Sequence, residues 1–282
     1  MLSIIVSSHK EDLYKNLEDN ILRTIGIEYE IIRVPNYGEM SIGQAYNLGA
    51  SKSLFSYLLF LHEDVEFKTL NWGQILIKHL NEEDVGVIGL AGSNYVPQAP
   101  NDWGMMEPYN FIHLIHGKGT EIESIFQCQN TRNRVFSIDG LFLAIRKKVF
   151  NEFQFDETLE GFHSYDLSIS LRIAKKYNNY VINNILVHHF SKGNPDKNWF
   201  LSNIMVKKEL GSDYNHPKND FTEYLIYKKF IRNAIRFLDN KTERNKQILK
   251  YYPKFNKIRP ILHIKLIYYI GKSFLFPERI IK

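Results

Sequence analysis

The stretch Tyr57-Leu-Leu-Phe-Leu-His-Glu-Asp-Val65 decides the fold. Five consecutive apolar or aromatic residues, 57–61, end abruptly in three polar ones. A strand that is apolar on both sides is typical of a parallel sheet covered by helices on both faces. We therefore expect a buried strand at 57–61, with Asp64 just beyond its carboxyl end.

Similar elements alternate on either side of this strand. The apolar runs predict strands, and the amphipathic stretches between them predict helices. The expected strands are 2–6, 30–34, 57–61 and 85–90, and the expected helices are 12–25, 41–53 and 71–80. This order indicates an α/β fold with a mostly parallel sheet flanked by helices.

The later chain is less regular. Residues 91–134 are rich in Gly, Pro, Asn and aromatics and predict a long irregular connection that lines or covers a site. After it we expect a strand at 136–145, a helix at 164–177 and a strand at 180–187 that ends in His188-His189. The remainder is mainly helical, so the predicted domains are 1–195 and a helical C-terminal extension, 196–282.

Composition narrows the class of protein. The 282 residues are 44% hydrophobic, enough for a substantial core, and carry a formal charge of +5. A single cysteine, Cys128, excludes an internal disulfide framework and suits a reducing, cytoplasmic compartment. The N-terminus reads as a first strand rather than a signal peptide, and no apolar run is long enough to span a membrane.

The basic excess lies in the last part of the chain. From Lys228 onward Lys and Arg outnumber Asp and Glu and alternate with apolar and aromatic residues. One interpretation is a peripheral contact with an anionic membrane surface through 258–282. The other is packing against the catalytic domain or a second subunit in a homo-oligomer.

Polar residues follow two of the expected strands. Asp64 suits a divalent cation such as Mg²⁺ or Mn²⁺, which binds carboxylate and phosphate oxygens. His188 and His189 likewise come at the end of a predicted strand. An imidazole ligand beside Asp64 would favour Mn²⁺ over Mg²⁺. Each of these residues has a structural explanation too, as a cap or a hydrogen-bonded strand end.

Asp166 lies in the first turn of the helix expected at 164–177. The helix dipole favours an anion there, which is reason enough for a carboxylate with no catalytic role. A role in chemistry requires that this end of the helix face the same cleft as Asp64. The chain has no phosphate-binding loop, dinucleotide fingerprint, Gly-x-Ser-x-Gly or His-Glu-x-x-His, so the commonest hydrolase and metalloprotease motifs are absent.

Taken in order, these pieces resemble the family 2 glycosyltransferases, which share the GT-A fold. The matching segments are Ser3-Ile-Ile-Val-Ser-Ser-His-Lys-Glu11, Gly43-Gln-Ala-Tyr-Asn-Leu-Gly-Ala50, Leu58-Leu-Phe-Leu-His-Glu-Asp-Val65, Asp139-Gly-Leu-Phe-Leu-Ala144, the region 161–172 and Val187-His-His-Phe-Ser191. The resemblance covers roughly residues 1–195 and departs from the family pattern in three places. Ser7-Ser8-His9-Lys10 replaces the usual Pro-Thr-Tyr-Asn, and Val34-Pro-Asn36 stands where many relatives have an Asp that reads the base. His62-Glu63-Asp64 stands where the family has Asp-x-Asp, so only the last carboxylate is retained.

The resemblance implies an inverting, metal-dependent transferase that moves a sugar from a nucleotide diphosphate, with UDP favoured, to a glycan or lipid-linked hydroxyl. Asp166 would be the catalytic base, and Asp64 with His188 or His189 would hold Mn²⁺ or Mg²⁺. The implied nucleotide-binding residues are Ser7, Ser8, Glu11, Asn36, Gln44, Asn47, His62 and Glu63. Contacts to the sugar or the acceptor are implied for Asp139, Gly140 and Trp103.

Two rival functions stay open at this point. One is a non-catalytic nucleotide-sugar-binding protein, because the Asp-x-Asp is altered. The other is an interaction protein that acts through its basic tail on a membrane or nucleic acid, although no nucleic-acid partner is expected. The composition suits a bacterial enzyme of polysaccharide biosynthesis.

Overall fold

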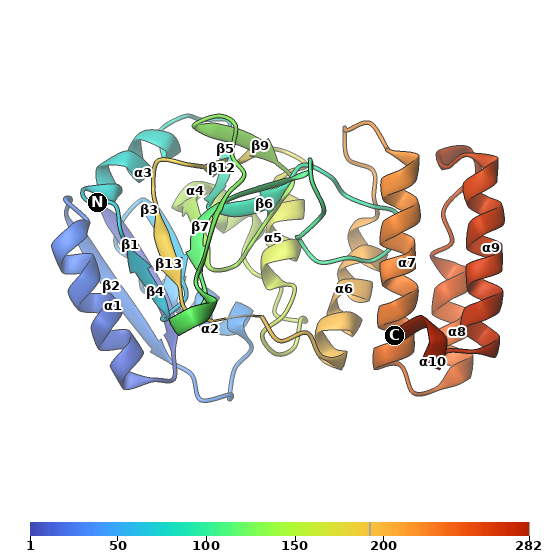
Figure 1. Cartoon of the computed structure of the whole chain (residues 1–282). Coiled ribbons are helices and arrows are strands. Elements are labelled where there is room, and N and C mark those ends of the chain that lie inside the picture. Colours follow the sequence, from blue (N-terminus) through green and yellow to red (C-terminus); the bar gives the residue numbers. More distant parts are fainter. Residues whose placement is uncertain (192, 282) are drawn as a thin grey trace. The chain divides into compact units, whose positions relative to one another are not determined.

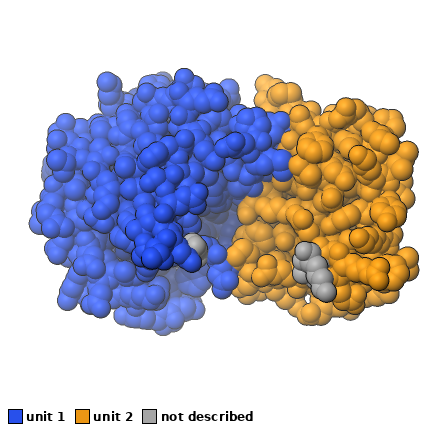
Figure 2. Space-filling model, in the orientation of Figure 1, with its two compact units in different colours: residues 1–95, 103–194 blue, residues 96–102, 195–282 orange. Residues whose placement is uncertain are grey.

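The computed structural model describes residues 1–191 and 193–281. The chain forms two compact units, coloured separately in Figure 2. The first comprises residues 1–95 and 103–194. The second comprises residues 96–102 together with the chain from residue 195 onward.

A seven-stranded sheet forms the centre of the first unit (Figure 1). Its strands, in spatial order, are β2 (Tyr29–Pro35), β1 (Leu2–Ser8), β3 (Tyr57–Leu61), β11 (Phe142–Arg146), β5 (Val85–Gly89), β12 (Asn178–Ile182) and β9 (Arg132–Val135). β1 is parallel to β2 and β3, and β12 is parallel to β5. β11 and β9 are antiparallel to their neighbours. The sheet is therefore mixed, with a parallel β2-β1-β3 half.

Successive residues of these strands enter two different apolar cores. In β3, Leu59 and Leu61 pack in one core, while Leu58 and Phe60 pack in the other. Side chains alternate across a strand, so a strand buried on both faces must be apolar at every position. This is the physical reason for the uninterrupted run 57–61.

Helices cover both faces of the sheet. They are α1 (Glu11–Thr24), α2 (Ile42–Ser51), α3 (Trp72–Leu80), α4 (Lys147–Phe153) and α5 (Tyr165–Ile173). α2 begins at a capping box, in which Ser41 Oγ accepts from the Gln44 backbone N–H and the Gln44 side chain accepts from the Ser41 N–H.

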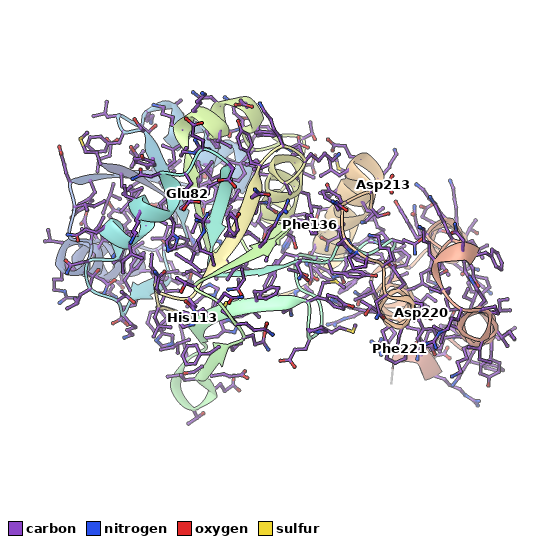
Figure 3. The ribbon with its side chains drawn as sticks, turned by 90° about the horizontal axis from the view of Figure 1, so that it is seen from above. Glu82, His113, Phe136, Asp213, Asp220 and Phe221 are labelled. Carbon is purple, nitrogen blue, oxygen red and sulfur yellow. The ribbon has the colours of Figure 1, made fainter. Side chains whose placement is uncertain are left out.

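A second, smaller sheet lies beside the carboxyl end of β3. Its strands are β10 (Ser137–Ile138), β6 (Ala91–Ser93), β7 (Asn110–His116), β13 (Val187–His189) and β4 (Val65–Phe67), with β8 (Glu123–Phe126) paired to β7. The chain passes from β9 of the first sheet to β10 of the second at Phe136, labelled in Figure 3.

Three sequence predictions for this region were wrong. The expected strand 180–187 is two strands, because the chain leaves the first sheet at β12 and enters the second at β13. The expected strand 136–145 is likewise β10 and β11, separated by the turn that contains Asp139 and Gly140. Residues 91–134 are not wholly irregular, since they contain β6 to β9 and the short 3-10 turn Gly119–Glu121.

The second unit is helical. Its helices are α6 (Lys197–Leu210), α7 (Asp220–Phe237), α8 (Lys241–Lys250), α9 (Pro260–Leu275) and α10 (Glu278–Ile281), with a 3-10 turn at Phe255–Lys257. Among the described residues, no helix combines the length and the apolarity needed to cross a membrane.

Residues 96–102 belong to this helical unit, which the predicted boundary at 195 did not anticipate. The buried Lys207 donates from Nζ to the Pro97 carbonyl at 2.6 Å and to the Gly211 carbonyl at 3.0 Å. The side chain of Lys218 donates to the Val96 carbonyl. Charged donors to backbone carbonyls leave no periodic pattern in the sequence, so this excursion of the chain could not be foreseen.

Candidate metal centre and nucleotide pocket

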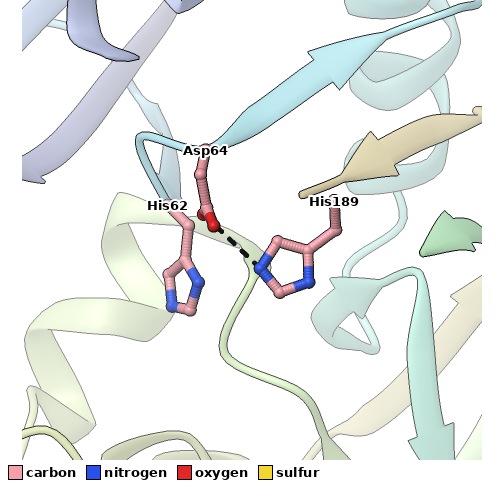
Figure 4. A group of neighbouring side chains, drawn as sticks. All are labelled: His62, Asp64 and His189. Atoms are coloured by element: carbon pink, nitrogen blue, oxygen red, sulfur yellow. Dashed lines mark ion pairs between the residues drawn. The ribbon is translucent and has the colours of Figure 1, made fainter. Parts of the chain in front are cut away.

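Three side chains from separate strand ends meet at one point (Figure 4). His62 follows β3, Asp64 precedes β4, and His189 is the last residue of β13. One ligand atom from each lies within 4.8 Å of the others. Asp64 Oδ1 and His189 Nε2 form an ion pair at 3.4 Å.

The donor set fits a divalent transition metal. Imidazole nitrogen suits metals such as Mn²⁺ and Zn²⁺ better than Mg²⁺, whereas a carboxylate accepts any of them. The Nε2 atom of His62 lies 2.8 Å from the Tyr165 hydroxyl. The other ring nitrogen of His62 is therefore the one free to bind an ion, and Figure 4 shows a ring nitrogen turned toward the Asp64 side.

The charges at this centre support one another. Burial alone would raise the pKa of Asp64, but the hydrogen bond and charge of His189, with that of His62, hold this pKa well below its usual value. Burial lowers the pKa of His62, and the nearby His189 lowers it further. For His189, Asp64 outweighs the effect of burial and raises the pKa. An ionised carboxylate and a neutral His62 are the forms that bind metal, whereas His189 must give up its proton to become a ligand.

His188 does not join this centre. Consecutive residues of a strand point to opposite faces, so His188 and His189 cannot both face Asp64. The His188 side chain is buried, and its Nε2 lies 2.8 Å from the Gly117 carbonyl oxygen. Of the two histidines that the sequence proposed as ligands, the geometry favours His189, and it adds His62, which the sequence had placed with the nucleotide.

Asp166 lies at the start of α5, where it is 9% exposed. Its Oδ2 accepts from the Gly140 backbone N–H at 2.9 Å, and its Oδ1 accepts from the Leu167 N–H at 2.8 Å. Burial, aided by the negative charge of Asp139, raises the pKa of Asp166 to about 7 in spite of these two bonds. A carboxylate with such a pKa is suited to accept a proton near neutrality.

Tyr165 connects Asp166 with the metal centre. Its ring is buried against Tyr46 and Phe155, with ring centroids 5.8 and 5.9 Å away. Its hydroxyl reaches His62 and also lies against the Cα of Gly140, where an added Cβ would be only 2.1 Å from the hydroxyl oxygen. A glycine at 140 is therefore needed for the close approach of Tyr165.

A pocket of 270 Å³ opens beside the centre at the carboxyl ends of β1 and β3. Ligands of open α/β sheets bind at this edge. Four of the predicted nucleotide-binding residues line it, namely Ser7, Asn36, His62 and Glu63, together with Asp64 from the metal centre. The remaining lining residues are His9, Lys10, Leu13, Ile42, Tyr46, Phe162, Tyr165 and Ser191.

The four other predicted nucleotide-binding residues make contacts within the fold. Ser8 and Glu11 both bind Arg33, at 3.2 and 2.7 Å. Gln44 completes the capping box of α2. Asn47 exchanges hydrogen bonds with the backbone of Phe155. None of the four is among the residues that line this pocket.

Glu63 has a structural contact as well. Its Oε1 lies 2.8 Å from His9 Nδ1, and its Oε2 accepts from the backbone N–H groups of His9 and Lys10. The carboxylate thus holds the turn between β1 and α1, which forms one wall of the pocket. This leaves Asp64 as the carboxylate of the 62–64 segment that faces the metal centre.

Asp139 and Trp103 each accept a hydrogen bond from a residue in or beside the turn between β10 and β11. Asp139 Oδ1 accepts from the Leu141 N–H at 2.9 Å, and its charge acts on Asp166. The Trp103 carbonyl accepts from Ser137 Oγ, and its ring packs on the first core. Sequence reasoning missed Tyr165 and Tyr46, although Tyr165 stands directly before Asp166 and could have been considered with it.

A second hollow of 410 Å³ adjoins the pocket and shares Glu63 and Asp64 with it. Its other walls come from α1, β4 and Phe190. Asp64 therefore lines both spaces.

Comparison with known proteins identifies the group to which this architecture belongs. Residues 3–224 match the family described as "Glycosyltransferase like family". A search of curated proteins finds no match.

Several solved structures are similar. GalNAc-T7 with UDP, GalNAc and Mn²⁺ is 14% identical with a TM-score of 0.52, and the match covers 97% of this chain and 57% of that one. TarS 1–349 of S. aureus is 13% identical with a TM-score of 0.56, covering 97% and 89%, and its complex with UDP is 12% identical with the same TM-score and coverage. This chain thus spans little more than half the length of GalNAc-T7.

At these identities the structural likeness shows the fold, and the family match shows the lineage. Both agree with the mixed sheet, its flanking helices and the C-terminal helices described above. The chain belongs to the family 2-like glycosyltransferases and has their GT-A fold.

Proposed function

We propose that this protein transfers a sugar from a UDP-sugar to an acceptor hydroxyl with inversion and with the help of a divalent cation. The observation that carries the proposal is the meeting of His62, Asp64 and His189 at the rim of the pocket. A donor diphosphate in that pocket would lie beside three metal ligands.

The donor site is assigned to the 270 Å³ pocket. Ser7 and Asn36 lie at the ends of β1 and β2, where the base and ribose would bind. Lys10, which also lines the pocket, supplies positive charge for a phosphate. The similar structures that hold UDP support UDP as the nucleotide.

The three metal ligands also suit the chemistry of sugar transfer. A cation held by His62, Asp64 and His189 would act as a Lewis acid and neutralise the charge that builds on the departing diphosphate. The protein's own contribution is to keep Asp64 ionised and His62 neutral, as the directions of their pKa shifts describe. Two imidazole ligands argue against Mg²⁺, and among transition metals we favour Mn²⁺ because the similar GalNAc-T7 structure holds it.

Asp166 is assigned as the base. The acceptor oxygen would form a bond to the anomeric carbon as the bond from that carbon to the phosphate oxygen breaks. The electron pair leaves with UDP, and the hydroxyl proton passes to Asp166. In this structure the carboxylate is nearly covered and does not line the 270 Å³ pocket. Catalytic contacts often form only in the substrate complex, so the acceptor must reach Asp166 after it binds.

Asp139 is the rival for the same role, because it is more exposed and its charge acts on Asp166. We assign Asp139 to orienting a sugar hydroxyl instead, since burial and a raised pKa suit Asp166 better to proton transfer. The acceptor is a glycan or a lipid-linked sugar, as the family resemblance implies.

The test is release of UDP from a panel of UDP-sugars with Mn²⁺, using wild type, Asp166→Asn, Asp139→Asn and a control, Asp239→Asn, whose carboxylate is 93% exposed. Loss of a general base lowers kcat by about 10²–10⁴. We expect such a loss in Asp166→Asn with UDP binding retained, and no change in the control. A protein that binds UDP but turns over no donor would instead be a binding module, and equal activity of wild type and Asp166→Asn would refute the assignment of the base.

A further inference from the structure

The C-terminal helix α9 carries apolar residues on two faces. One face is buried inside the second unit, through Leu262, Leu266 and Ile270, which are 4, 0 and 8% exposed. The helix packs on α7 and α10 through this side. The inner face is the one that packs α9 into its unit.

The outer face of α9 is apolar as well, yet it is exposed. Ile261, Ile264, Tyr268 and Leu275 are 54, 64, 74 and 73% exposed. Spacings of three, four and seven residues place them in one stripe along the helix. Ile267, 59% exposed, lies at the edge of the same surface. We call this set of five side chains the outer stripe.

The surroundings of the outer stripe are basic. Lys265 and Lys272, seven residues apart, lie along its other edge, and α9 contains no acidic residue. Residues 251–281 hold six Lys and Arg but only one acidic residue, Glu278. Arg259 is paired with Asp220, which Figure 3 labels at the start of α7. Within the described part of the chain, no ion pair is found for Lys265 or Lys272.

An apolar stripe edged by unpaired lysines fits the surface of an anionic membrane. A helix in such a surface buries its apolar side chains among the lipid chains while its lysines bind anionic headgroups. Tyr268 would lie at the boundary, where aromatic rings with a polar end are favoured. We propose that the outer stripe of α9 binds an anionic lipid surface and holds the protein there as a peripheral membrane protein.

A second copy of the chain is the main alternative occupant. A symmetric contact would place the same basic patch on both partners, so lysines of one copy would approach lysines of the other. Like charges that meet in a contact oppose it. The charge of the surface therefore favours anionic lipid over self-association.

Lipid binding by the outer stripe would add to the proposed function, but the binding itself does not require it. A transferase held on a membrane surface is suited to a lipid-linked acceptor, which is the part that rests on the proposed function. Binding of the outer stripe to lipid needs neither the nucleotide pocket nor the metal centre. The two claims can therefore fail separately.

The experiment is co-sedimentation of the full chain with vesicles of phosphatidylcholine, with and without added phosphatidylglycerol, in the absence of nucleotide and metal. Wild type should bind the anionic vesicles and be released by salt. Each lysine near an anionic surface strengthens binding by a factor of about five. Reversing both charges in Lys265→Glu/Lys272→Glu should therefore weaken binding at least 25-fold, on the order of the two factors multiplied.

A matched control carries the same change of charge elsewhere. Lys241→Glu/Lys246→Glu alters two exposed lysines of α8 and should keep most of the binding. For the apolar part, Ile264→Ser should weaken binding severalfold, whereas Leu249→Ser, also at an exposed apolar position, should not. Asp64→Ala should bind vesicles as wild type does, whatever happens to its catalysis.

Three results would overturn the proposal. They are no binding of wild type to anionic vesicles, equal losses in the α8 control and the α9 variant, and a concentration-dependent dimer that Ile264→Ser dissociates. The last would assign the outer stripe to a second copy. None of the substituted side chains is fully buried, and circular dichroism should show that all variants remain folded.

Discussion

Replacing Gly140 by alanine is the sharpest test of how the site is packed. The new Cβ would lie 2.1 Å from the Tyr165 hydroxyl oxygen and 2.5 Å from Cζ of the same ring. The ring cannot move aside freely, because Tyr165 is 5% exposed and packed against Tyr46 and Phe155. The substitution therefore forces Tyr165 away from His62.

The cost can be estimated from two contributions. Overpacking of a buried site by a methyl group costs about 1–3 kcal/mol. Loss of the hydrogen bond between Tyr165 and His62 adds about 1 kcal/mol. We expect Gly140→Ala to lower the free energy of unfolding by about 2–4 kcal/mol.

Urea unfolding measures this change, with Gly271→Ala as the matched control. Gly271 lies in α9 with no atom within 4 Å of an added Cβ, so alanine there should be neutral or stabilising by up to about 1 kcal/mol. In a double variant with Tyr165→Phe, the hydroxyl that Cβ would meet first is gone. The double variant should therefore lose less stability than the sum of the losses in Gly140→Ala and Tyr165→Phe. Equal stability of Gly140→Ala and wild type would refute the close packing of Tyr165 on Gly140.

Three further predictions follow from the same structure. Tyr165→Phe removes the hydroxyl that is hydrogen-bonded to His62. Loss of a group that orients a metal ligand weakens metal binding by about 10–100-fold, so titration with Mn²⁺ should show a loss of affinity in this range. The rate kcat/KM should rise with pH and level off above about 7, because Asp166 must lose its proton to act as a base and burial raises its pKa to about 7. Lys207→Met removes the donor to the Pro97 and Gly211 carbonyls and should lower the free energy of unfolding by about 1–3 kcal/mol. The control Lys208→Met, at the exposed neighbouring position, should change it by about 0.5 kcal/mol or less.

Contrary results have distinct meanings. If Tyr165→Phe binds Mn²⁺ as wild type does, the hydroxyl does not orient His62. A flat profile of kcat/KM between pH 5 and pH 8 would mean that Asp166 does not titrate there as the base. If Lys207→Met is as stable as Lys208→Met, the hydrogen bond from Lys207 to Pro97 does not help to hold residues 96–102 in the helical unit.

Much of the fold follows from the sequence, because β1, β3 and β5 are buried on both faces. The run 57–61 identifies β3, and similar runs identify β1, β2 and β5. The second sheet was not foreseen. Its longest strand, β7, lies within residues 91–134, which read as an irregular connection, and β4, β6, β10 and β13 have only two or three residues each. Strands so short show no period, and their pairing depends on contacts far apart in the chain.

The site was predicted in outline only. Position after a buried strand pointed to Asp64, and the structure brings it beside His189. The sequence could not separate His188 from His189, because the choice depends on which face of β13 turns toward Asp64. Nor could it find the contact of His62 with Tyr165, whose positions are 103 residues apart.

The central claim is that His62, Asp64 and His189 form a metal centre on which UDP binds. The direct measurement is titration of Mn²⁺, followed by its electron paramagnetic resonance signal, with and without UDP. The proteins are wild type, Asp64→Asn, His189→Ala and His188→Gln. We predict that wild type and His188→Gln bind Mn²⁺ and take up UDP only with it, and that the other two lose affinity for the metal by at least about tenfold. Unchanged Mn²⁺ affinity in Asp64→Asn and His189→Ala, or UDP binding that is indifferent to Mn²⁺, would contradict the account.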